Sequence, residues 1–216
     1  MQHTDNLIAA YERHAAERDV SSPDQFKELE KREFRDRLAR ESRHTLLELG
    51  CGPGHDAAQF RDAGFAVTAI DTTPAMVDLA RQKGVEARHL DCYHLDRLAE
   101  TFDAVYSMNC LLHVPNADIA RVLELISERL EPGGLMYLGL WGGDDFEGIW
   151  EGDKYEPKRF FSFRSGRTLL DLVQERFQLE YYRRLHPRPT TPDARFHSLI
   201  ARRPPGIARK TSGRAP

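Results

Sequence analysis

The run LLELGCGPG, at residues 46–54, decides the fold of this chain. It is an apolar strand that passes into a glycine-rich turn and then into a helix. Glycines in such a turn let the backbone approach a ligand closely. The N-terminus of the following helix adds free N–H groups and the positive end of the helix dipole. The run therefore predicts a strand–turn–helix unit that binds a ligand.

The spacing of the three glycines argues against two nucleotide sites. A dinucleotide site requires G-x-G-x-x-G, whereas Gly50, Gly52 and Gly54 form G-x-G-x-G and His55 stands where the third glycine would be. The phosphate-binding loop G-x-x-x-x-G-K-[ST] is also absent, because His55 and Asp56 follow the last glycine. The turn therefore disfavours a pyrophosphate or a nucleoside triphosphate as its ligand.

Around this unit, short apolar runs alternate with helical stretches. We expect strands at 45–49, 66–70, 85–90, 102–107 and 135–140, and helices at 55–63, 74–83 and 117–130. Strands joined through helices need crossover connections, so the pattern predicts an α/β fold with a doubly wound, mostly parallel sheet. Glu131-Pro132-Gly133-Gly134 is expected to end the last of these helices with a C-cap glycine.

Residues 1–44 are expected to form a helical cover in front of this core. Residues 1–20 have the pattern of an amphipathic helix. Ser22, Pro23 and Gln25 fit the N-cap, N1 and N3 positions of a capping box, which predicts the start of a second helix.

Residues 142–166 form an insert rich in aromatic and charged side chains. A connection of this length inside a domain is more often functional, such as a lid, than inert. After the insert, residues 167–203 are expected to form a helix at 168–177 and an antiparallel hairpin with strands at 178–185 and 195–201. Residues 204–216 are basic and contain Pro, Gly and Ser, which is typical of a disordered tail.

Composition narrows the class of protein. The 216 residues are 40% hydrophobic and 30% charged, with a formal net charge of −3. We therefore expect a globular chain with no membrane span and no basic field that attracts nucleic acid. Cys51, Cys92 and Cys110 form no C-x-x-C pair and no zinc knuckle, so we expect reduced thiols and no metal. The first residues lack the features of a signal peptide, which indicates a cytoplasmic location.

Three acidic residues lie at the ends of neighbouring strands. Asp71 closes the second strand, where a carboxylate can accept both hydroxyls of a ribose, and Asp91 closes the third, where a polar side chain can meet the amino group of an adenine. Each acid alone can instead cap the following helix. Together with Glu48 they lie at the edge where open α/β sheets bind ligands. The three acids favour a ligand with hydroxyls, amines and a positive centre.

Residues 45–141 resemble the class I S-adenosylmethionine-dependent methyltransferases, in particular the small single-domain, methyltransferase 11/25-like type. The motifs that carry the resemblance are LLELGCGPGHDAAQFRDAGFAVTAIDTTPAMVDLARQKG, Asp91-Cys92, FDAVYSMNCLLHVP and LEPGGLMYLGLW, in this order. The resemblance implies a Rossmann-like, seven-stranded sheet in the order 3-2-1-4-5-7-6, with the last strand antiparallel and helices on both faces. It also implies a single methyltransferase domain over residues 1–203, with the cofactor-binding core at 45–141.

The resemblance implies S-adenosyl-L-methionine (SAM) as the cofactor and S-adenosyl-L-homocysteine (SAH) as its product. The first motif would hold the methionyl part, Asp71 the ribose, and Asp91 the adenine edge. The run YERHAAERD, which contains Tyr11 and His14, resembles the family's lid helix. The residues implied to bind the cofactor are Tyr11, Glu48, Gly50, Cys51, Gly52, Gly54, Asp71, Thr72, Met76, Asp91, Cys92, Met108 and Asn109. For Met76 the alternative is simple core packing.

The mechanism follows from the implied cofactor. A sulfonium methyl is already an excellent electrophile, so the enzyme mainly aligns acceptor atom, methyl and sulfur in a dry site. A hydroxyl acceptor must also lose a proton. We expect His113 to be the base, because it follows the fourth strand and imidazole titrates near neutral pH. The alternative is that His113 only hydrogen-bonds the backbone and shapes the pocket.

The insert is expected to select the acceptor. Its aromatic rings can stack on a flat or apolar molecule, and Lys158, Arg159 or Arg164 can meet an anionic group. The alternative is that the aromatic residues form the insert's own core. The residues expected to contact the acceptor are Trp141, Trp150, Tyr155, Phe160, Phe161 and Arg164.

We therefore expect an enzyme that transfers a methyl group by in-line displacement to an oxygen or nitrogen of a small-molecule acceptor, in specialised metabolism. We expect a monomer or homodimer with no nucleic-acid or membrane partner. The alternatives are an RNA or protein methyltransferase, a regulatory module that binds SAM without chemistry, and an NAD-dependent oxidoreductase. The presence of Glu48, the glycine turn, Asp71 and Asp91 together argues against a module that has lost its site.

Overall fold

Strand β1 (Thr45–Leu49), the apolar half of the glycine-rich run, lies inside a seven-stranded sheet in the computed structural model, which describes residues 2–187 and 195–206. The strand order is β3-β2-β1-β4-β5-β9-β8. Strands β1 to β5 all pair in parallel, whereas β9 runs antiparallel to both of its neighbours, β5 and β8. The other strands of this sheet are β2 (Ala66–Asp71), β3 (Glu86–His89), β4 (Phe102–Met108), β5 (Leu130–Gly142), β8 (Gln178–Leu185) and β9 (Arg195–Arg202).

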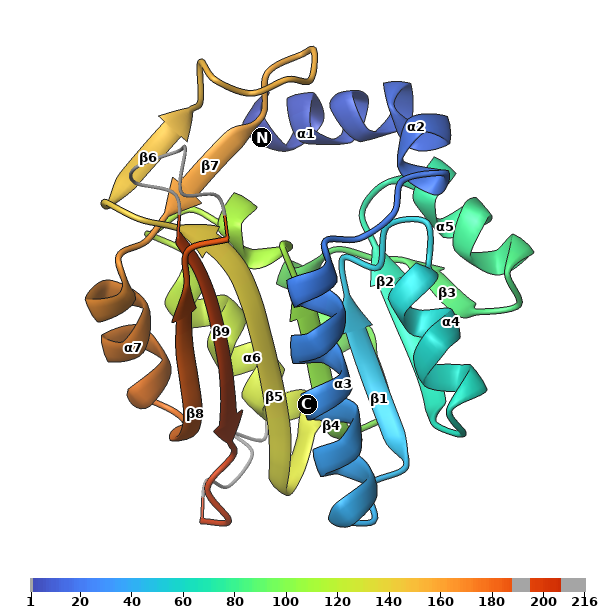
Figure 1. The fold of residues 1–216 in the computed structure, drawn as a ribbon, viewed down its shortest axis with the longest axis vertical. Coiled ribbons are helices and arrows are strands. Elements are labelled where there is room, and N and C mark those ends of the chain that lie inside the picture. Colours follow the sequence, from blue (N-terminus) through green and yellow to red (C-terminus); the bar gives the residue numbers. More distant parts are fainter. Residues whose placement is uncertain (1, 188–194, 207–216) are drawn as a thin grey trace, which may run out of the picture.

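Helices cover both faces of the sheet (Figure 1). One face carries α3 (Gln25–Arg40), α4 (His55–Asp62) and α5 (Pro74–Gln82), and the opposite face carries α6 (Ile119–Arg129) and α7 (Gly166–Gln174). Each helix buries one apolar stripe, as its period predicts. Phe34 of α3, for example, packs on Phe60 and Tyr106, while Val122 and Val173 belong to the core on the other face.

Helix α3 is also held by a buried polar contact to the sheet edge. Glu30 is only 3% exposed, and it accepts hydrogen bonds from Tyr181, Arg183 and Ser198, with the Ser198 Oγ at 2.6 Å. A buried carboxylate is stable when its oxygens are satisfied in this way. The contact attaches the N-terminal segment to the β8–β9 hairpin.

The remaining elements lie above one end of the sheet (Figure 1). Helices α1 (Gln2–Arg13) and α2 (Ala15–Asp19) belong to the N-terminal segment, and β6 (Phe146–Ile149) and β7 (Phe160–Phe163) form a separate hairpin in the insert. Two short 3-10 helices, η1 (Cys92–Arg97) and η2 (Leu111–His113), follow β3 and β4. Among the described helices, none has the length and apolar character that crossing a membrane requires.

The predicted fold class and strand order are confirmed. Strands β6 and β7 belong to a separate sheet in the insert, so β8 and β9 are the sixth and seventh strands of the main sheet. They occupy the places expected for strands 6 and 7. The insert hairpin itself was not predicted, because its strands are short and its alternation is interrupted by Gly148 and several charges. The expected tail at 204–216 lies outside the described residues from residue 207 onward.

Three local predictions are wrong. The first helix is interrupted at His14. Helix α3 begins at Gln25 with Asp24 as its N-cap, so Ser22 does not cap it. The run Glu131–Gly134 does not end α6, because α6 passes at Arg129 directly into β5, where Gly133 has a φ of +79° near a register shift opposite Phe102 and Ala104.

Candidate functional site

A cavity of about 1020 Å³ lies at the carboxyl ends of the central strands. The glycine turn and the ends of β2 to β5 form its floor, and α1, α2 and the insert form its cover. This is the edge at which open α/β sheets bind ligands, and the volume is at the upper end of the usual range for small-molecule sites.

The glycine turn is built by positive φ angles and backbone hydrogen bonds. Gly50 has a φ of +67° and Gly52 a φ of +54°, a region that favours glycine. A Cβ at Gly50 would lie 2.7 Å from Sγ of Cys110. The N–H of Gly52 donates to Oδ2 of Asp71 at 2.8 Å, and the N–H of Gly50 donates to the carbonyl of Ile70. The turn is therefore tied to the end of β2.

Gly54 has a different task from the other two glycines. It does not line the cavity, and a Cβ there would lie 2.6 Å from Cβ of Ala80. Its missing side chain lets α4 approach α5. The expectation that Gly54 contacts the cofactor is therefore not supported, and its place in the motif has a packing reason.

The three acids at the strand ends all line the cavity, in different states of pairing. Asp71 accepts the N–H groups of Gly52 and Thr73, each at 2.8 Å, and Asp91 accepts the N–H of Tyr93 at 2.9 Å as N-cap of η1. The capping alternative is thus observed for Asp91, whose Oδ1 also lies 2.8 Å from Nδ1 of His94. Glu48 is 3% exposed, and its Oε2 has no hydrogen-bond partner among the described residues. Burial raises the pKa of Glu48 well above its usual value, and nearby Asp56 adds to the effect.

The other residues expected to bind the cofactor also lie on the cavity wall: Tyr11, Cys51, Thr72, Met76, Cys92, Met108 and Asn109. Met76 is 1% exposed, so it serves the core as well as the wall. The Oδ1 of Asn109 is buried without a hydrogen-bond partner in the described structure, and the residue has a φ of +56°. The cavity therefore presents at least two unsatisfied oxygen acceptors, on Glu48 and Asn109.

Arg18 was not among the residues predicted to bind the cofactor. This residue of α2 lines the cavity, with its Nη2 3.9 Å from the position that a Cβ of Gly52 would take and its guanidinium 5.2 Å from the ring centre of Tyr11. Its Nε is buried without a partner in the described structure. In the sequence it is one of several charges on an amphipathic helix, which normally face solvent.

His113 lies between the N-terminal cover and the insert. Its Nδ1 is 2.8 Å from the carbonyl oxygen of Phe160, so Nδ1 carries the proton, and its Nε2 is 3.0 Å from the hydroxyl of Tyr11. Burial, with a smaller contribution from the nearby Arg159, lowers the pKa of His113 to about 3. The expectation that this imidazole titrates near neutral pH is wrong.

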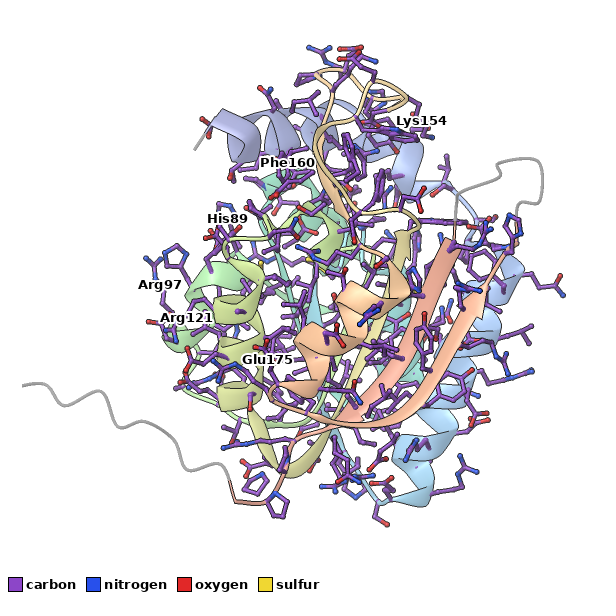
Figure 2. The ribbon with its side chains drawn as sticks, turned by 90° about the vertical axis from the view of Figure 1, so that its left-hand side faces the viewer. His89, Arg97, Arg121, Lys154, Phe160 and Glu175 are labelled. Atoms are coloured by element: carbon purple, nitrogen blue, oxygen red, sulfur yellow. The ribbon has the colours of Figure 1, made fainter. Side chains whose placement is uncertain are left out.

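The insert contributes an aromatic wall. Trp141, Trp150, Phe160 and Phe161 line the cavity together with Phe146 and Phe163. The rings of Trp150 and Phe161 lie 5.6 Å apart, and those of Phe161 and Phe163 lie 5.0 Å apart, so the wall is also the core of the insert. The same side chains therefore pack together as the core of the insert and also line the cavity, where an acceptor could contact them. Figure 2 shows Phe160 and Lys154 in the upper part of the molecule, above the sheet.

Three other residues expected near the acceptor do not reach the cavity. Tyr155 is 3% exposed and stacks on His14 at 4.2 Å. Arg164 is 1% exposed, and its guanidinium donates to backbone carbonyls, including that of Val114 at 2.7 Å.

Lys158 also lies off the cavity wall, because its Nζ donates to the carbonyl of Glu151. Arg159 does line the cavity, but it is paired with a carboxylate of the insert. The expected contact of Arg164 with an anionic acceptor is therefore wrong, because its guanidinium is buried against backbone carbonyls.

No cluster of three metal-ligating side chains occurs within residues 2–187 and 195–206. The polar groups of the cavity instead suit an organic ligand. Arg18 offers a cation, Glu48 an unpaired carboxylate, and Asp71 and Asp91 offer acceptors at two further strand ends.

Comparison with known proteins agrees with this arrangement. Residues 46–134 match the family model described as a methyltransferase domain. A ubiquinone biosynthesis O-methyltransferase of Xylella fastidiosa (strain M23) is 35% identical over 100 residues, which cover 43% of this chain and 40% of that relative. The matched segment thus spans less than half of the curated relative.

Solved structures extend the likeness to nearly the whole chain. The 1,6-didemethyltoxoflavin-N1-methyltransferase of Burkholderia thailandensis, crystallised with 1,6-didemethyltoxoflavin and SAH, has a TM-score of 0.70 at 23% identity, over 94% of this chain and 89% of that one. The DhpI–SAH complex has a TM-score of 0.66 at 23% identity, over 92% of this chain and 95% of that one. At this identity the likeness concerns the fold. Residues 46–134 are therefore similar to a methyltransferase domain, and the described part of the chain has the same fold as these two SAH-bound structures.

Proposed function

We propose that this chain is a SAM-dependent methyltransferase that transfers a methyl group to an oxygen or nitrogen of a small-molecule acceptor. The observation that carries the proposal is the convergence of the glycine turn, Glu48, Asp71, Asp91 and Arg18 on one cavity that also has an aromatic wall. The two similar proteins, an O-methyltransferase and an N1-methyltransferase, support a small acceptor and leave both oxygen and nitrogen open as the methylated atom.

The cavity fits the parts of SAM. Arg18 can hold the methionyl carboxylate, and the unpaired Oε2 of Glu48 can face the cationic methionyl end. Asp71 can accept the ribose hydroxyls on lone pairs that its two backbone contacts leave free. Asp91 can meet the adenine edge. The orphaned atoms on Glu48, Asn109 and Arg18 are what a site shaped for a polar ligand presents.

When bound, SAM supplies a methyl group that is already electrophilic. The protein's part is to orient the acceptor, exclude water and accept the proton where the acceptor has one. The aromatic wall, with Trp141 and Trp150, can hold a flat acceptor by stacking. The cover of α1, α2 and the insert lines part of the cavity and would limit the access of water there.

Calorimetry with SAH tests the cofactor site. We expect wild-type protein to bind SAH and Asp71→Asn to bind it at least tenfold more weakly, because an amide keeps one acceptor oxygen and replaces the other with an NH2 donor. Asp78→Asn is the matched control, since the side chain of Asp78 is 68% exposed on α5 and, within the described structure, pairs with the neighbouring Arg81. No binding of SAH by the wild type, with thermal stabilisation by NADH instead, would favour an oxidoreductase and overturn the proposal.

A transfer assay with radiolabelled SAM tests the chemistry. The panel holds phenols, amines, nitrogen heterocycles and carboxylates, each with and without a planar ring. We expect label in a planar phenol or nitrogen heterocycle, and less transfer by Trp150→Ala. Binding of SAH without transfer to any member would favour a regulatory module.

A further inference from the structure

A continuous set of hydrogen bonds joins the two covers of the cavity through His113. The insert contributes Asp153, Arg159 and Phe160, the N-terminal cover contributes Tyr11, and His113 belongs to η2 behind β4. Strand β7 also packs against α1 and η2. The two covers are therefore in direct contact, and one side chain of the core touches both.

The direction of each hydrogen bond in this set is determined. Asp153 holds Arg159 with two bonds, from Nε to Oδ2 at 2.8 Å and from Nη2 to Oδ1 at 2.6 Å, which aims Nη1 at the hydroxyl of Tyr11 at 2.8 Å. That hydroxyl accepts from Arg159, so its own proton points to Nε2 of His113. His113 in turn donates from Nδ1 to the carbonyl of Phe160.

Further contacts join the N-terminal cover to the insert. The ring of Tyr155 in the insert stacks on His14 with centres 4.2 Å apart and planes 7° apart. Lys154 pairs with Glu17 of α2 at 2.9 Å. The guanidinium of Arg159 lies 4.2 Å from the ring centre of Tyr155. The insert is thus attached along α1 and α2, the segment that also carries Arg18.

We infer that His113 is a positioning residue that holds the N-terminal cover and the insert in register, so that loading of the cofactor half of the cavity orders the acceptor half. The inference rests on the proposed function. Arg18, on the cover, faces the glycine turn, and the aromatic wall belongs to the insert. A ligand that favours an ordered cover then also favours an ordered insert, because the contacts between them depend on His113 keeping both in register.

The alternative role of His113 as a base makes a different demand on the side chain. A base needs a free lone pair and a proton affinity matched to the working pH, whereas a positioning residue needs one donor and one acceptor about 2.2 Å apart. In this structure both ring nitrogens are engaged. A glutamine amide supplies the same donor and acceptor without any basicity, so His113→Gln separates the two roles.

Amide hydrogen exchange of the full chain, with and without saturating SAH, tests the coupling. In the wild type we expect SAH to slow exchange at least fivefold both at the glycine turn (50–54) and in the insert (146–163). His113→Gln should keep both effects. His113→Ala should keep the effect at the turn and lose most of it in the insert. Saturation removes any influence of a weakened affinity.

Tyr11→Phe provides a second variant that retains the ring. It removes only the hydroxyl that joins Arg159 to His113, and we expect the same loss of insert protection as in His113→Ala. Full insert protection in both His113→Ala and Tyr11→Phe would overturn the inference, as would loss of protection in His113→Gln. SAH binding in the wild type without any insert protection would refute the coupling alone, and no SAH binding at all would refute the proposed function as well.

Discussion

Gly54 and Gly64 both have a positive φ, of +82° and +97°, but they differ in what surrounds them. A Cβ at Gly54 would lie 2.6 Å from Cβ and 2.8 Å from Cα of Ala80, whereas nothing lies within 4 Å of one at Gly64. The two positions therefore separate backbone strain from a steric clash between α4 and α5.

We expect Gly64→Ala to lower the free energy of unfolding by about 1 kcal/mol through the left-handed backbone alone. Gly54→Ala should lower it by about 3 kcal/mol, because α4 must also move away from α5. Urea unfolding followed by circular dichroism measures both. Equal losses would contradict the packing role assigned to Gly54.

Glu48 has an unpaired buried carboxyl group that can serve a ligand but lowers the stability of the ligand-free protein. Its pKa is raised by burial and by Asp56, so the folded state holds a proton that the unfolded state releases as the pH rises above the usual range for glutamate. The penalty on folding is therefore absent at low pH and grows toward neutral pH.

At pH 7 we expect Glu48→Gln to raise the free energy of unfolding of the ligand-free protein by about 1 kcal/mol and to weaken SAH binding about tenfold. Near pH 4 the difference in stability should vanish. Glu33→Gln is the control, since Glu33 is 57% exposed. A stability gain that persists at pH 4 would point to a cause other than the carboxyl proton.

At the scale of elements, the insert hairpin depends on one buried ion pair. The side chain of Asp153 is 1% exposed and that of Arg159 is 11% exposed, and the carboxylate also accepts the backbone N–H of Arg159 at 3.0 Å. Removing one partner of such a pair leaves a buried charge, which costs about 3–5 kcal/mol. The loss falls on the insert, because both partners belong to it.

Asp153→Asn should therefore loosen the insert while the sheet stays folded. We expect cleavage by a nonspecific protease within residues 146–163 at least tenfold faster than in the wild type, with little change in the far-ultraviolet circular dichroism. Glu151→Gln is the matched control, because Glu151 lies in the same insert with its side chain 87% exposed. Equal cleavage of the two variants would show that the ion pair does not hold the hairpin.

At the scale of the whole molecule, two buried imidazoles couple folding to pH. Burial lowers the pKa of His113 to about 3 and that of His197 to about 4. Below about pH 6.5 the unfolded chain protonates these groups and the folded chain does not, so stability falls as the pH falls from 6.5 toward 4.

Each imidazole should contribute a slope of about 1.4 kcal/mol per pH unit within that window. His113→Gln removes one of them, so its unfolding free energy should fall less steeply between pH 6.5 and pH 5 than that of the wild type. Urea titrations at intervals of half a pH unit measure the two slopes. Identical slopes would mean that His113 is protonated in the folded state.

The sequence by itself determined the mostly parallel sheet and the position of the ligand edge, whereas the strand order was implied by the resemblance to the methyltransferase family. These features depend on local patterns, namely the periods of apolar residues, the spacing of the turn glycines, and the acids Asp71 and Asp91 at strand ends. Such patterns act within one element or between neighbours, so they are visible along the chain. The exceptions, at Ser22 and at Glu131–Gly134, are element ends, where tertiary pairing overrides a cap signal.

Only the tertiary structure decided how the cover, the insert and the core act on one another. Tyr11 meets His113 across 102 residues and Arg159 across 148, and no local pattern records such pairs. The same holds for Arg164, whose charge predicts a surface or a ligand contact but whose guanidinium serves buried carbonyls. Burial and hydrogen-bond direction are properties of surroundings contributed by distant segments. Because of these surroundings His113 is an uncharged imidazole that contacts both the N-terminal cover and the insert.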